Sequence, residues 1–391
     1  MYHTIIIGAG PVGSYLADKL SCLGYKVLVL DKKVTAEEDI CCTGIIGKEC
    51  LDLLSVDNDL MIRQANSARF LVSSGRSLRL WRDDEVAYII DRPALNLELA
   101  SRAQADGACY LFNTQVTDIQ VESGCIRVEA DYYGKNRFFE AETAVIAAGF
   151  SSPLLGKFNL GKVNDFVVGA QAEVQIKGVD EVEIYFDQTL ARGGFAWLVP
   201  TKDSKGLAGL MARQQPELYL NKLLSSLKAH DKIISTEVIP NYGVIPLRPI
   251  SRTYADRLLV VGEAAGQVKP STGGGIYYGL LCADIAVDSL HQAFLANDFS
   301  KSRLASYQKQ WRAKLDREIQ TGYWARRLYE RLSNRQIEHL YNVISSDGIP
   351  GLITESSDFS FDWHGDLILK MLKHLAASVP AQAVKSFSRH K

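Results

Sequence analysis

The sequence predicts an α/β protein: a Rossmann-like dinucleotide-binding domain with an inserted mixed β-sheet substrate domain and a C-terminal helical region. Three observations support this fold class. A glycine-rich loop follows an apolar strand at the start, alternating apolar and polar residues fill the middle, and a second glycine-rich loop opens an apolar helix late in the chain. The expected division is 1–160 and 249–297 for the dinucleotide-binding domain, 161–248 for the inserted sheet, and 298–391 for the helical region.

Composition excludes several classes of protein. A chain of 391 residues is longer than one compact core normally holds, and its formal net charge of −1 argues against a nucleic-acid partner. No apolar run is long enough to span a membrane, and the first residues resemble a strand rather than a signal peptide, so we expect a cytoplasmic protein. The 7 cysteines have no regular spacing, so we expect reduced thiols and no metal site.

The first glycine-rich loop has the spacing of a dinucleotide-binding turn. Gly8 permits a tight turn, Gly10 lets the backbone approach a pyrophosphate, and Gly13 lets the next helix pack closely on the strand. The following strand ends in Asp31, whose carboxylate can accept hydrogen bonds from ribose hydroxyls. An acid at this position disfavours a 2′-phosphate. The loop therefore predicts FAD or NAD and leaves the choice between them open.

Two segments after this loop carry candidate site residues. Cys41, Cys42 and Gly44 form a turn whose thiols are either buried apolar fillers or neighbours of a bound flavin ring. Arg92 stands near the start of an amphipathic helix, where it either makes a surface salt bridge or reaches a phosphate or a ribityl chain. Val116 lies in a strand whose backbone can pair with an adenine edge.

Alternating strands between residues 163 and 246 predict the inserted sheet. This region carries several aromatic side chains, namely Tyr185, Phe186, Phe195 and Trp197. Such residues are either ordinary core or the walls of an apolar substrate pocket. We assign Tyr185, Phe195 and Trp197 to a substrate pocket.

The second glycine-rich loop, GEAAGQVKPSTGGGIYYG, begins at Gly262 after an apolar strand. The helix that starts near Gly275 is apolar on all sides, so we expect it to be buried, and its free N–H groups then need a partner. The pyrimidine edge of a flavin meets this need because the reduced ring carries negative charge there. Glu263 can accept hydrogen bonds from the ribityl hydroxyls. The late loop thus completes the site of the first loop, and together they predict FAD.

The chain resembles the FAD-dependent geranylgeranyl reductase family, a branch of the flavoprotein group that includes para-hydroxybenzoate hydroxylase. The resemblance covers most of the chain and rests on the motifs GAGPVGSYLA, CCTG, DRPALNLELA, YFDQTLARGGFAWLVP, VGEAAGQVKPSTGGGIYYG, LSNRQIEHL and DWHGDLILKML. It implies an FAD-binding domain of the para-hydroxybenzoate hydroxylase type. It also implies FAD contacts at Val12, Asp31, Cys41, Cys42, Gly44, Arg92, Val116, Glu263, Gly275 and Ile276. We add the loop glycines Gly8, Gly10, Gly13 and Gly262.

Two departures from the related motifs bear on the chemistry. The late motif usually contains Gly-Asp, and here it contains Gly262-Glu263, which keeps the carboxylate but extends its reach. The Ala-Asp-Gly of NADPH-using hydroxylases is replaced by residues 147–149, Ala-Ala-Gly. The electron donor is therefore left open between NAD(P)H and a ferredoxin-type protein.

The resemblance implies reduction of isolated C=C bonds in a prenyl chain attached to a lipid, a quinone or a chlorophyll precursor. Hydride passes from the reduced flavin to one alkene carbon while a proton reaches the other. This reaction requires a dry, apolar channel. Cys41 is a candidate proton donor, although an ordinary thiol is a weak acid for this step, and water or a flavin-linked proton is the alternative.

Two other classes of function stay open. One is a flavin-dependent monooxygenase or halogenase, because GFAWLVP is similar to the halogenase segment G-W-x-W-x-I-P, with Phe195 in place of the first tryptophan. The other is a flavin-binding electron carrier without catalysis. Oxygen dependence and turnover of a prenyl lipid distinguish the three.

The C-terminal segment predicts a peripheral membrane contact, because a prenyl lipid resides in a membrane. The segment from His364 is amphipathic and basic, with one acid, Asp366. Its basic residues are Lys370, Lys373, Lys385, Arg389 and Lys391. The segment either lies on the anionic inner face of a membrane or forms a packed surface helix with a frayed end.

Overall fold

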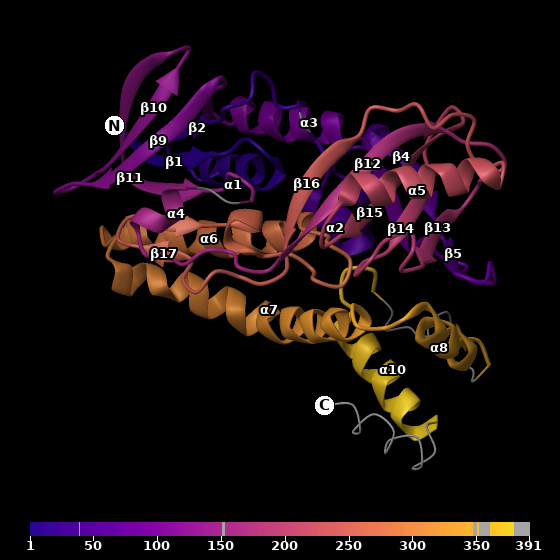
Figure 1. Cartoon of the computed structure of the whole chain (residues 1–391). Helices are drawn as coiled ribbons and strands as arrows, with labels where there is room; N and C mark the ends of the chain where they lie inside the picture. The colour runs from indigo at the N-terminus through magenta and orange to yellow at the C-terminus, as the bar shows by residue number, and fades with distance from the viewer. Residues whose placement is uncertain (39, 151–152, 347–349, 352–359, 379–391) are drawn as a thin grey trace.

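The computed structural model describes residues 1–38, 40–150, 153–346, 350–351 and 360–378 (Figure 1). Within these residues the strands form three sheets, with helices packed on both large ones. Lys385, Arg389 and Lys391 of the predicted basic tail lie outside the described residues, as does the side chain of Lys373. None of the helices in the described part combines the length and apolar character needed to cross a bilayer.

The first sheet has a parallel centre. Across it the strands are β18 (Leu258–Val260), β11 (Lys135–Ile146), β1 (Tyr2–Ile7), β2 (Val27–Leu30) and β8 (Cys109–Leu111). Three antiparallel strands complete it: β17 (Tyr254–Ala255) beside β18, then β10 (Ile126–Tyr132) and β9 (Thr114–Val121) beyond the long β11. Because β18, β11 and β1 are parallel neighbours, the loops that follow β1 and β18 emerge at the same edge of the sheet.

Alternate residues of each strand point to opposite faces of this sheet, and helices cover one of the two faces. Ile6 packs against α1 (Pro11–Cys22) and α6 (Ile276–Ala296), whereas Ile5 and Ile7 belong to the apolar cluster on the other side. Helix α3 (Arg92–Ala105) lies beside α1, and α7 (Lys301–Tyr329) packs along α6. The prediction that the late helix is buried is confirmed, since apolar residues along most of α6 are inaccessible.

The second sheet is mixed, as the sequence predicts. Its strands, in order, are β16 (Asn241–Pro246), β12 (Phe166–Gln175), β15 (Lys205–Ala212), β14 (Ala196–Pro200), β13 (Val182–Phe186), β5 (Ser67–Val72) and β6 (Ser77–Trp81). Helix α5 (Pro216–Ala229) covers one face through Leu220, Leu223 and Leu224. The last two strands come from the region expected in the dinucleotide-binding domain. The proposed division of the chain into domains stays a prediction.

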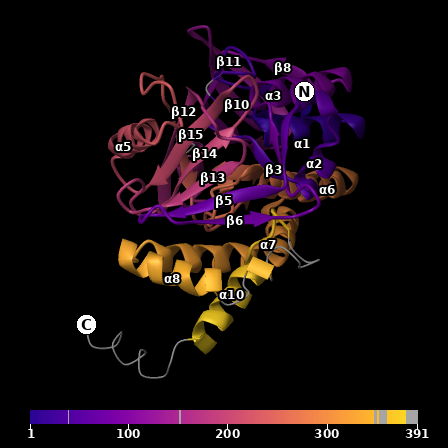
Figure 2. The same ribbon diagram turned by 90° about the vertical axis from the view of Figure 1, so that its right-hand side faces the viewer.

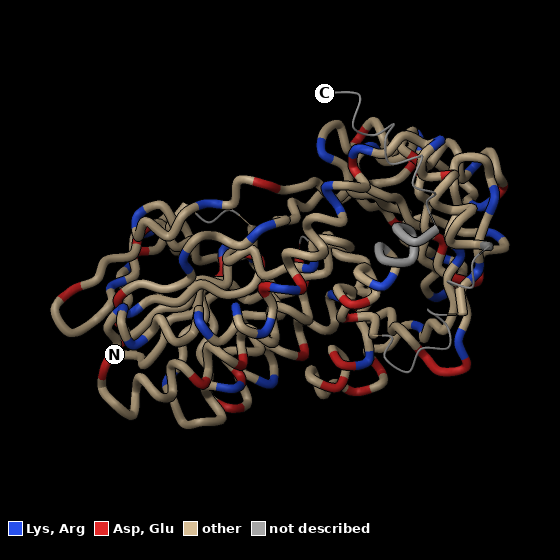
Figure 3. The backbone as a smooth tube through the Cα atoms, turned by 90° about the horizontal axis from the view of Figure 1, so that it is seen from below, with Lys and Arg blue, Asp and Glu red and all other residues tan. Residues whose placement is uncertain are grey.

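The remaining elements connect these layers. A small sheet is formed by β3 (Ile45–Gly47), β7 (Ala87–Ile90) and β4 (Met61–Ala65), and α2 (Lys48–Leu54) follows its first strand. At the C-terminal end, α8 (Asn334–Ser346) and α10 (Gly365–Ser378) lie beneath β5 and β6 (Figure 2). Basic and acidic residues are interspersed along the chain, in keeping with the near-zero net charge (Figure 3).

Gly13 fixes the distance between α1 and the turn that precedes it. A methyl group placed on Gly13 would lie 1.9 Å from the Gly8 carbonyl oxygen and 3.4 Å from the Ala147 side chain. The first contact is with main chain, which cannot rotate away. The helix can therefore start this close to the sheet only with glycine at this position, which is the packing role expected of the third loop glycine.

We expect Gly13→Ala to lower the free energy of unfolding by about 1–3 kcal/mol, because the added methyl group must displace the Gly8 turn. Gly10→Ala is the matched control, since its methyl group would meet no atom within 4 Å and its φ of −71° suits alanine. Urea unfolding of both ligand-free variants, followed by circular dichroism, measures the difference. Equal stability of the two variants would contradict the packing role.

Candidate functional site

A cavity of about 1210 Å³ opens at the edge of the first sheet where both glycine-rich loops emerge. It continues along the second sheet to α8 and α10. The predicted site residues that line it are Gly8, Gly10, Val12, Asp31, Cys41, Cys42, Gly44, Arg92, Val116, Phe195, Trp197, Gly262, Glu263, Gly275 and Ile276. Two predicted residues do not line it: Gly13 lies beneath the turn, and Tyr185 faces elsewhere.

The two glycine-rich loops meet at Val12. A methyl group on Gly262 would lie 3.3 Å from Val12 Cγ2, and one on Gly279 would lie 2.4 Å from the same atom. These two glycines let α6 begin against the first turn of α1. The N-termini of two helices, which begin at Pro11 and Ile276, therefore open on one cavity, and their free N–H groups favour an anionic ligand.

The end of the cavity near β1 and β2 has the geometry of an adenosine and pyrophosphate site. Gly10 caps α1 without a side chain and faces open space, so the N–H groups of the first turn stay accessible. Asp31 is held by its main-chain neighbours: Ala9 N–H donates to Oδ2 at 2.6 Å, and Lys33 N–H donates to Oδ1 at 2.9 Å. Val116 lines the same region. This arrangement fits a dinucleotide of the FAD type.

Arg92 is a buried cation with spare hydrogen-bonding capacity. Its side chain lines the cavity, and the residue is 7% exposed. Nη1 donates to Asn96 Oδ1 at 3.0 Å, while Nε has no hydrogen-bond partner among the described residues. A buried, incompletely paired guanidinium beside a cavity fits an anionic group such as a phosphate. Of the two roles that the sequence leaves open for Arg92, the surface salt bridge is wrong.

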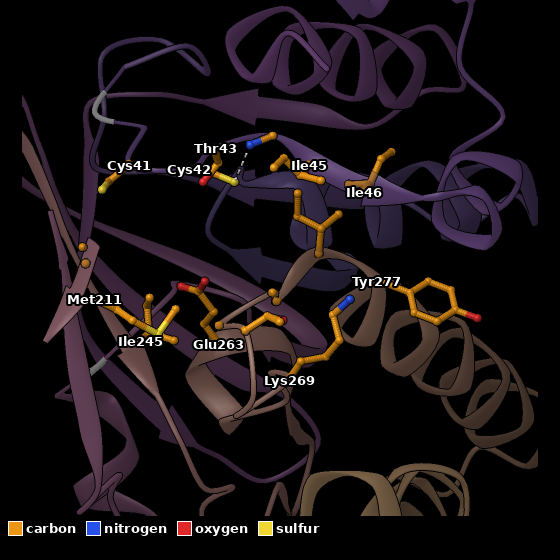
Figure 4. Close-up of a pocket in the computed structure, with 18 of the residues that line it drawn as sticks. Cys41, Cys42, Thr43, Ile45, Ile46, Met211, Ile245, Glu263, Lys269 and Tyr277 are labelled. Carbon is orange, nitrogen blue, oxygen red and sulfur yellow. Dashed lines mark hydrogen bonds between the residues drawn. The ribbon is translucent and has the colours of Figure 1, made fainter. Parts of the chain in front are cut away.

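Glu263 follows β18 and lies across the cavity from Cys41 and Cys42 (Figure 4). Its Oε1 would be 3.2 Å from a methyl group on Gly275, so the carboxyl group lies at the start of α6. Loss of hydration raises the pKa of Glu263, and the charge of Arg92 offsets part of the rise. Glu263 is thus positioned to accept hydrogen bonds from a polar chain running between the two loops.

The CCTG turn forms the opposite wall. Cys41 Sγ lies 3.5 Å from the Asn241 carbonyl oxygen, and Gly44 N–H donates to Cys42 Sγ at 3.4 Å. Burial raises the pKa of Cys41 to about 11, with Cys42 and Glu263 adding to the rise. Cys41 is therefore a protonated thiol at neutral pH. Gly44 has a φ of +73°, and a methyl group there would meet the Ile90 carbonyl oxygen at 2.4 Å, so the turn needs glycine.

The second sheet provides the floor of the cavity, which changes from polar to apolar. The strand register places Gln171, Gly209, Trp197, Ile184, Phe70 and Leu78 in one row across successive strands. Gln171 lies near the CCTG turn, and Leu78 lies at the far edge under α8. Beside this row, Phe186 stacks on Phe70 and contacts Phe195 and Tyr329.

The predicted pocket role of Tyr185 is wrong. Ile184 and Phe186 line the cavity, so Tyr185 between them points to the opposite face of β13. There it packs in the apolar cluster under α5, and its hydroxyl lies between Glu183 and Lys232. Phe195 and Trp197 do line the cavity, which supports the pocket alternative for these two residues.

The ceiling of the apolar part was not predicted from the sequence. It consists of Ile337, Leu340, Tyr341 and Ile344 from α8 and Leu367, Ile368 and Met371 from α10. The α8 residues follow the i, i+3, i+4, i+7 spacing of one helix face, so a search for amphipathic helices would have found this apolar stripe. It would not have identified β5 and β6 as the surface that the stripe covers.

One carboxylate fastens α8 to the β5–β6 turn. Glu338 Oε1 accepts hydrogen bonds from Ser74 N at 2.7 Å and from Ser73 Oγ at 3.0 Å. Its Oε2 accepts from Ser74 Oγ at 2.9 Å and from Arg76, and Arg76 Nη1 also reaches Asn342 Oδ1. Loss of hydration alone would raise the pKa of Glu338, but these hydrogen bonds outweigh it and lower the pKa to about 2.

A second fastening ties the segment before α10 to the late glycine-rich loop. Lys269 Nζ lies 3.2 Å from Asp362 Oδ1, and the two side chains are 5% and 2% exposed. Glu49 Oε2 accepts hydrogen bonds from Tyr277 at 2.6 Å and from Trp363 at 2.8 Å. These pairs could not be predicted from the sequence, because their members are far apart along the chain.

Fold and site together define a flavoprotein in which a Rossmann-like domain and a mixed sheet share one cavity. The chain belongs to the tryptophan halogenase family, whose family model matches residues 48–321. Curated relatives carry a different name. The digeranylgeranylglycerophospholipid reductase of Methanocaldococcus jannaschii is 26% identical over 362 residues, covering 89% of this chain and 92% of the relative. That of Methanothrix thermoacetophila is 27% identical, covering 88% and 92%. The predicted resemblance to geranylgeranyl reductases is confirmed.

Solved structures confirm the predicted fold class. A geranylgeranyl bacteriochlorophyll reductase-like protein from Thermoplasma acidophilum superposes with a TM-score of 0.85 at 20% identity, over 99% of this chain and 98% of that one. A mutant of the halogenase PltM in complex with FAD superposes with a TM-score of 0.69 at 14% identity, over 98% and 84%. At these identities the likeness concerns the fold.

We expect Glu338→Gln to lower the free energy of unfolding at neutral pH by about 1–2 kcal/mol, because the hydrogen bonds to a charged acceptor are weakened. The pKa of Glu338 is lower in the folded protein than in the unfolded chain. Its contribution is therefore complete above about pH 4.5 and declines as the pH falls toward 2. Chemical denaturation at neutral pH and near pH 3 should show the two proteins converging.

The matched control for this experiment is Glu173→Gln, which removes an exposed ion pair with Lys205 on the second sheet. We expect it to change stability by less than about 0.5 kcal/mol at either pH. If the difference in the free energy of unfolding between wild type and Glu338→Gln stays constant with pH, ionised Glu338 does not stabilise the contact between α8 and the β5–β6 turn.

Proposed function

We propose that this protein is an FAD-dependent oxidoreductase that reduces C=C bonds of a prenyl chain carried on a lipid-like molecule. The observation that carries the proposal is the continuity of the cavity, which leads from the dinucleotide-binding loops into an apolar arm between the second sheet and α8. Curated relatives named digeranylgeranylglycerophospholipid reductase support a prenylated lipid as the substrate class.

FAD is the cofactor, and it supplies hydride transfer when bound. The N-terminus of α1 and Asp31 would hold its adenosine and pyrophosphate part, with Val116 beside the adenine. Arg92 would neutralise phosphate charge. Glu263 and the N-terminus of α6 would hold the ribityl chain and the pyrimidine edge, opposite the CCTG turn.

The apolar arm suits a long hydrocarbon chain. From β12 to β6 the cavity floor crosses five strand spacings, or about 24 Å at about 4.8 Å each, and it is apolar beyond Gln171 of β12. The walls of the arm are aromatic and aliphatic, with Phe70 and Phe186 on the floor and Ile337 and Leu340 above. These side chains exclude water and align the chain so that one of its double bonds faces the CCTG turn. An isolated alkene needs such a dry environment, since no carbonyl stabilises developing charge.

The second alkene carbon needs a proton, and we propose Cys41 as its donor. The thiol is protonated at neutral pH, lies in the cavity wall, and has only the Asn241 carbonyl as a hydrogen-bond acceptor in the described structure. A thiol with a pKa of about 11 is nevertheless a weak acid. Water is the alternative donor, and a Cys41 substitution distinguishes the two.

The substrate and the electron donor imply partners outside the chain. A prenyl lipid resides in a membrane, so we propose peripheral contact of the C-terminal region with the inner membrane face. Helix α10 supports this, since its apolar residues line the arm and the exposed Lys370 lies on the same helix. Electrons would come from NAD(P)H or from a ferredoxin-type protein.

Halogenation or oxygenation is the second candidate function, favoured by the name of the family model and by the halogenase fold. Both reactions require oxygen, whereas reduction of an alkene does not. The purified protein, with its flavin reduced by dithionite, is mixed anaerobically with a digeranylgeranyl glycerophospholipid. We expect flavin reoxidation and a lipid mass increase of two hydrogens per saturated bond. If the flavin is reoxidised only when oxygen is admitted and the lipid mass is unchanged, the result contradicts alkene reduction and supports halogenation or oxygenation.

We expect Cys41→Ser to retain FAD and to lower the anaerobic turnover number by at least about tenfold, because a serine hydroxyl is a much weaker acid than a thiol. Cys109→Ser is the control, since Cys109 is an exposed thiol on β8 that does not line the cavity, and it should turn over as wild type does. Flavin absorbance reports cofactor content, and stopped-flow reoxidation reports turnover. Full turnover by flavin-loaded Cys41→Ser would assign the proton to water.

A further inference from the structure

A second cavity, of about 530 Å³, lies at the junction of α7 and the second sheet. Four of the described residues that line it are arginines, Arg192, Arg213, Arg327 and Arg331, and Glu330 is the one acid among them. The remaining lining residues are uncharged. A concave surface with this composition attracts anions rather than apolar groups.

The carboxylates near this cavity are already occupied. Glu330 accepts hydrogen bonds from Arg213 Nε at 3.0 Å, from Arg326 Nε at 3.0 Å and from Arg327 Nη1 at 3.0 Å. Asp165 pairs with Arg213 as well. Among the described residues, Glu330 and Asp165 are thus the two carboxylates paired with the arginine side chains at this cavity. Arg326, which is one of these arginines, is almost fully buried. Burial lowers the pKa of Arg326, and the neighbouring Arg213 cation contributes to this.

Two of the lining arginines have their donors available. The side chains of Arg192 and Arg331 make no hydrogen bond or ion pair within the described part of the chain. With Arg326 included, the cluster holds five guanidinium groups and two carboxylates, a formal excess of three positive charges. An anion entering the cavity would meet unpaired guanidinium forks and would relieve repulsion among the cations.

The wall between the two cavities is thin. Arg326 Nη2 donates to the Gly193 carbonyl oxygen at 3.0 Å, on the side of the second cavity. Its Nη1 contacts Met211 Sδ at 2.9 Å, and Met211 lines the first cavity. The same Nη1 lies 3.4 Å from the Pro270 carbonyl oxygen in the late glycine-rich loop. The arginine cluster therefore lies directly behind the proposed flavin site.

We propose that the second cavity is a binding site for a phosphate-bearing group, held by Arg192 and Arg331 with Arg213 and Arg327 beside them. The charge excess matches a phosphate monoester or a pyrophosphate better than a single carboxylate, and planar guanidinium groups bind phosphate oxygens in pairs. Such a group occurs in a nucleotide and in a phospholipid headgroup. The assignment rests on the second cavity alone and holds whichever reaction the flavin site performs.

Isothermal titration of the FAD-loaded full chain with inorganic pyrophosphate tests the site. We expect saturable binding that weakens by at least about tenfold, or about 1.4 kcal/mol, in the double variant Arg192→Gln/Arg331→Gln. Both side chains are exposed, so the double variant should fold, and circular dichroism verifies this. The control is Arg317→Gln, an exposed α7 arginine paired with Asp366 outside this cavity, which should bind as wild type does.

Competition against pyrophosphate identifies the source of the phosphate. Displacement by NADPH but not by short-chain phosphatidic acid, whose headgroup is a phosphate monoester, supports a nucleotide, and the reverse result supports a lipid headgroup. The proposal is overturned by an absence of saturable pyrophosphate binding, or by equal affinity of wild type and the double variant. Neither result bears on anaerobic alkene reduction, so failure of this site and failure of the proposed function are separate outcomes.

Discussion

The contact of two helix N-termini over Val12 is the constraint on which the rest of the structure depends. The two helices start from loops after β1 and β18, and these strands flank β11 in parallel, so both loops open at one sheet edge. Gly262 and Gly279 permit the final approach. Two positive helix ends at one place favour an extended anionic ligand, and the cavity, the CCTG turn and Glu263 are arranged around that place.

The sequence was sufficient to predict the parts of the site that depend on residues close together in the chain. Loop spacing, strand ends and the apolar helix identified both glycine-rich loops, Asp31 and Glu263 as parts of one site. Alternation in the inserted strands predicted the mixed sheet. It could not indicate which face of β13 borders the cavity, and for that reason Tyr185 was assigned to the wrong face. Phe195 and Trp197 do line the cavity, and their role toward a substrate stays a prediction.

The remaining parts depend on contacts between distant segments. Strand β5 joins the second sheet by pairing with β13, which lies more than 100 residues later, and β6 joins by pairing with β5. Glu338 and Arg76 are separated by 262 positions, and Lys269 and Asp362 by 93. Each of these residues looks like an ordinary surface charge in the sequence. Only the three-dimensional packing turns them into the fastenings that hold α8 and the segment before α10 over the cavity.

The two faces of the second sheet are under different evolutionary constraints. Residues on the face toward α5 maintain the fold, and residues on the other face determine the shape and polarity of the cavity. Because the two sets alternate along every strand, mutations can accumulate on the cavity side without disturbing the packing beneath α5. Such a scaffold can diversify its substrates over evolution while its backbone stays nearly constant. That independence accounts for one architecture appearing in proteins named reductases and in proteins named halogenases.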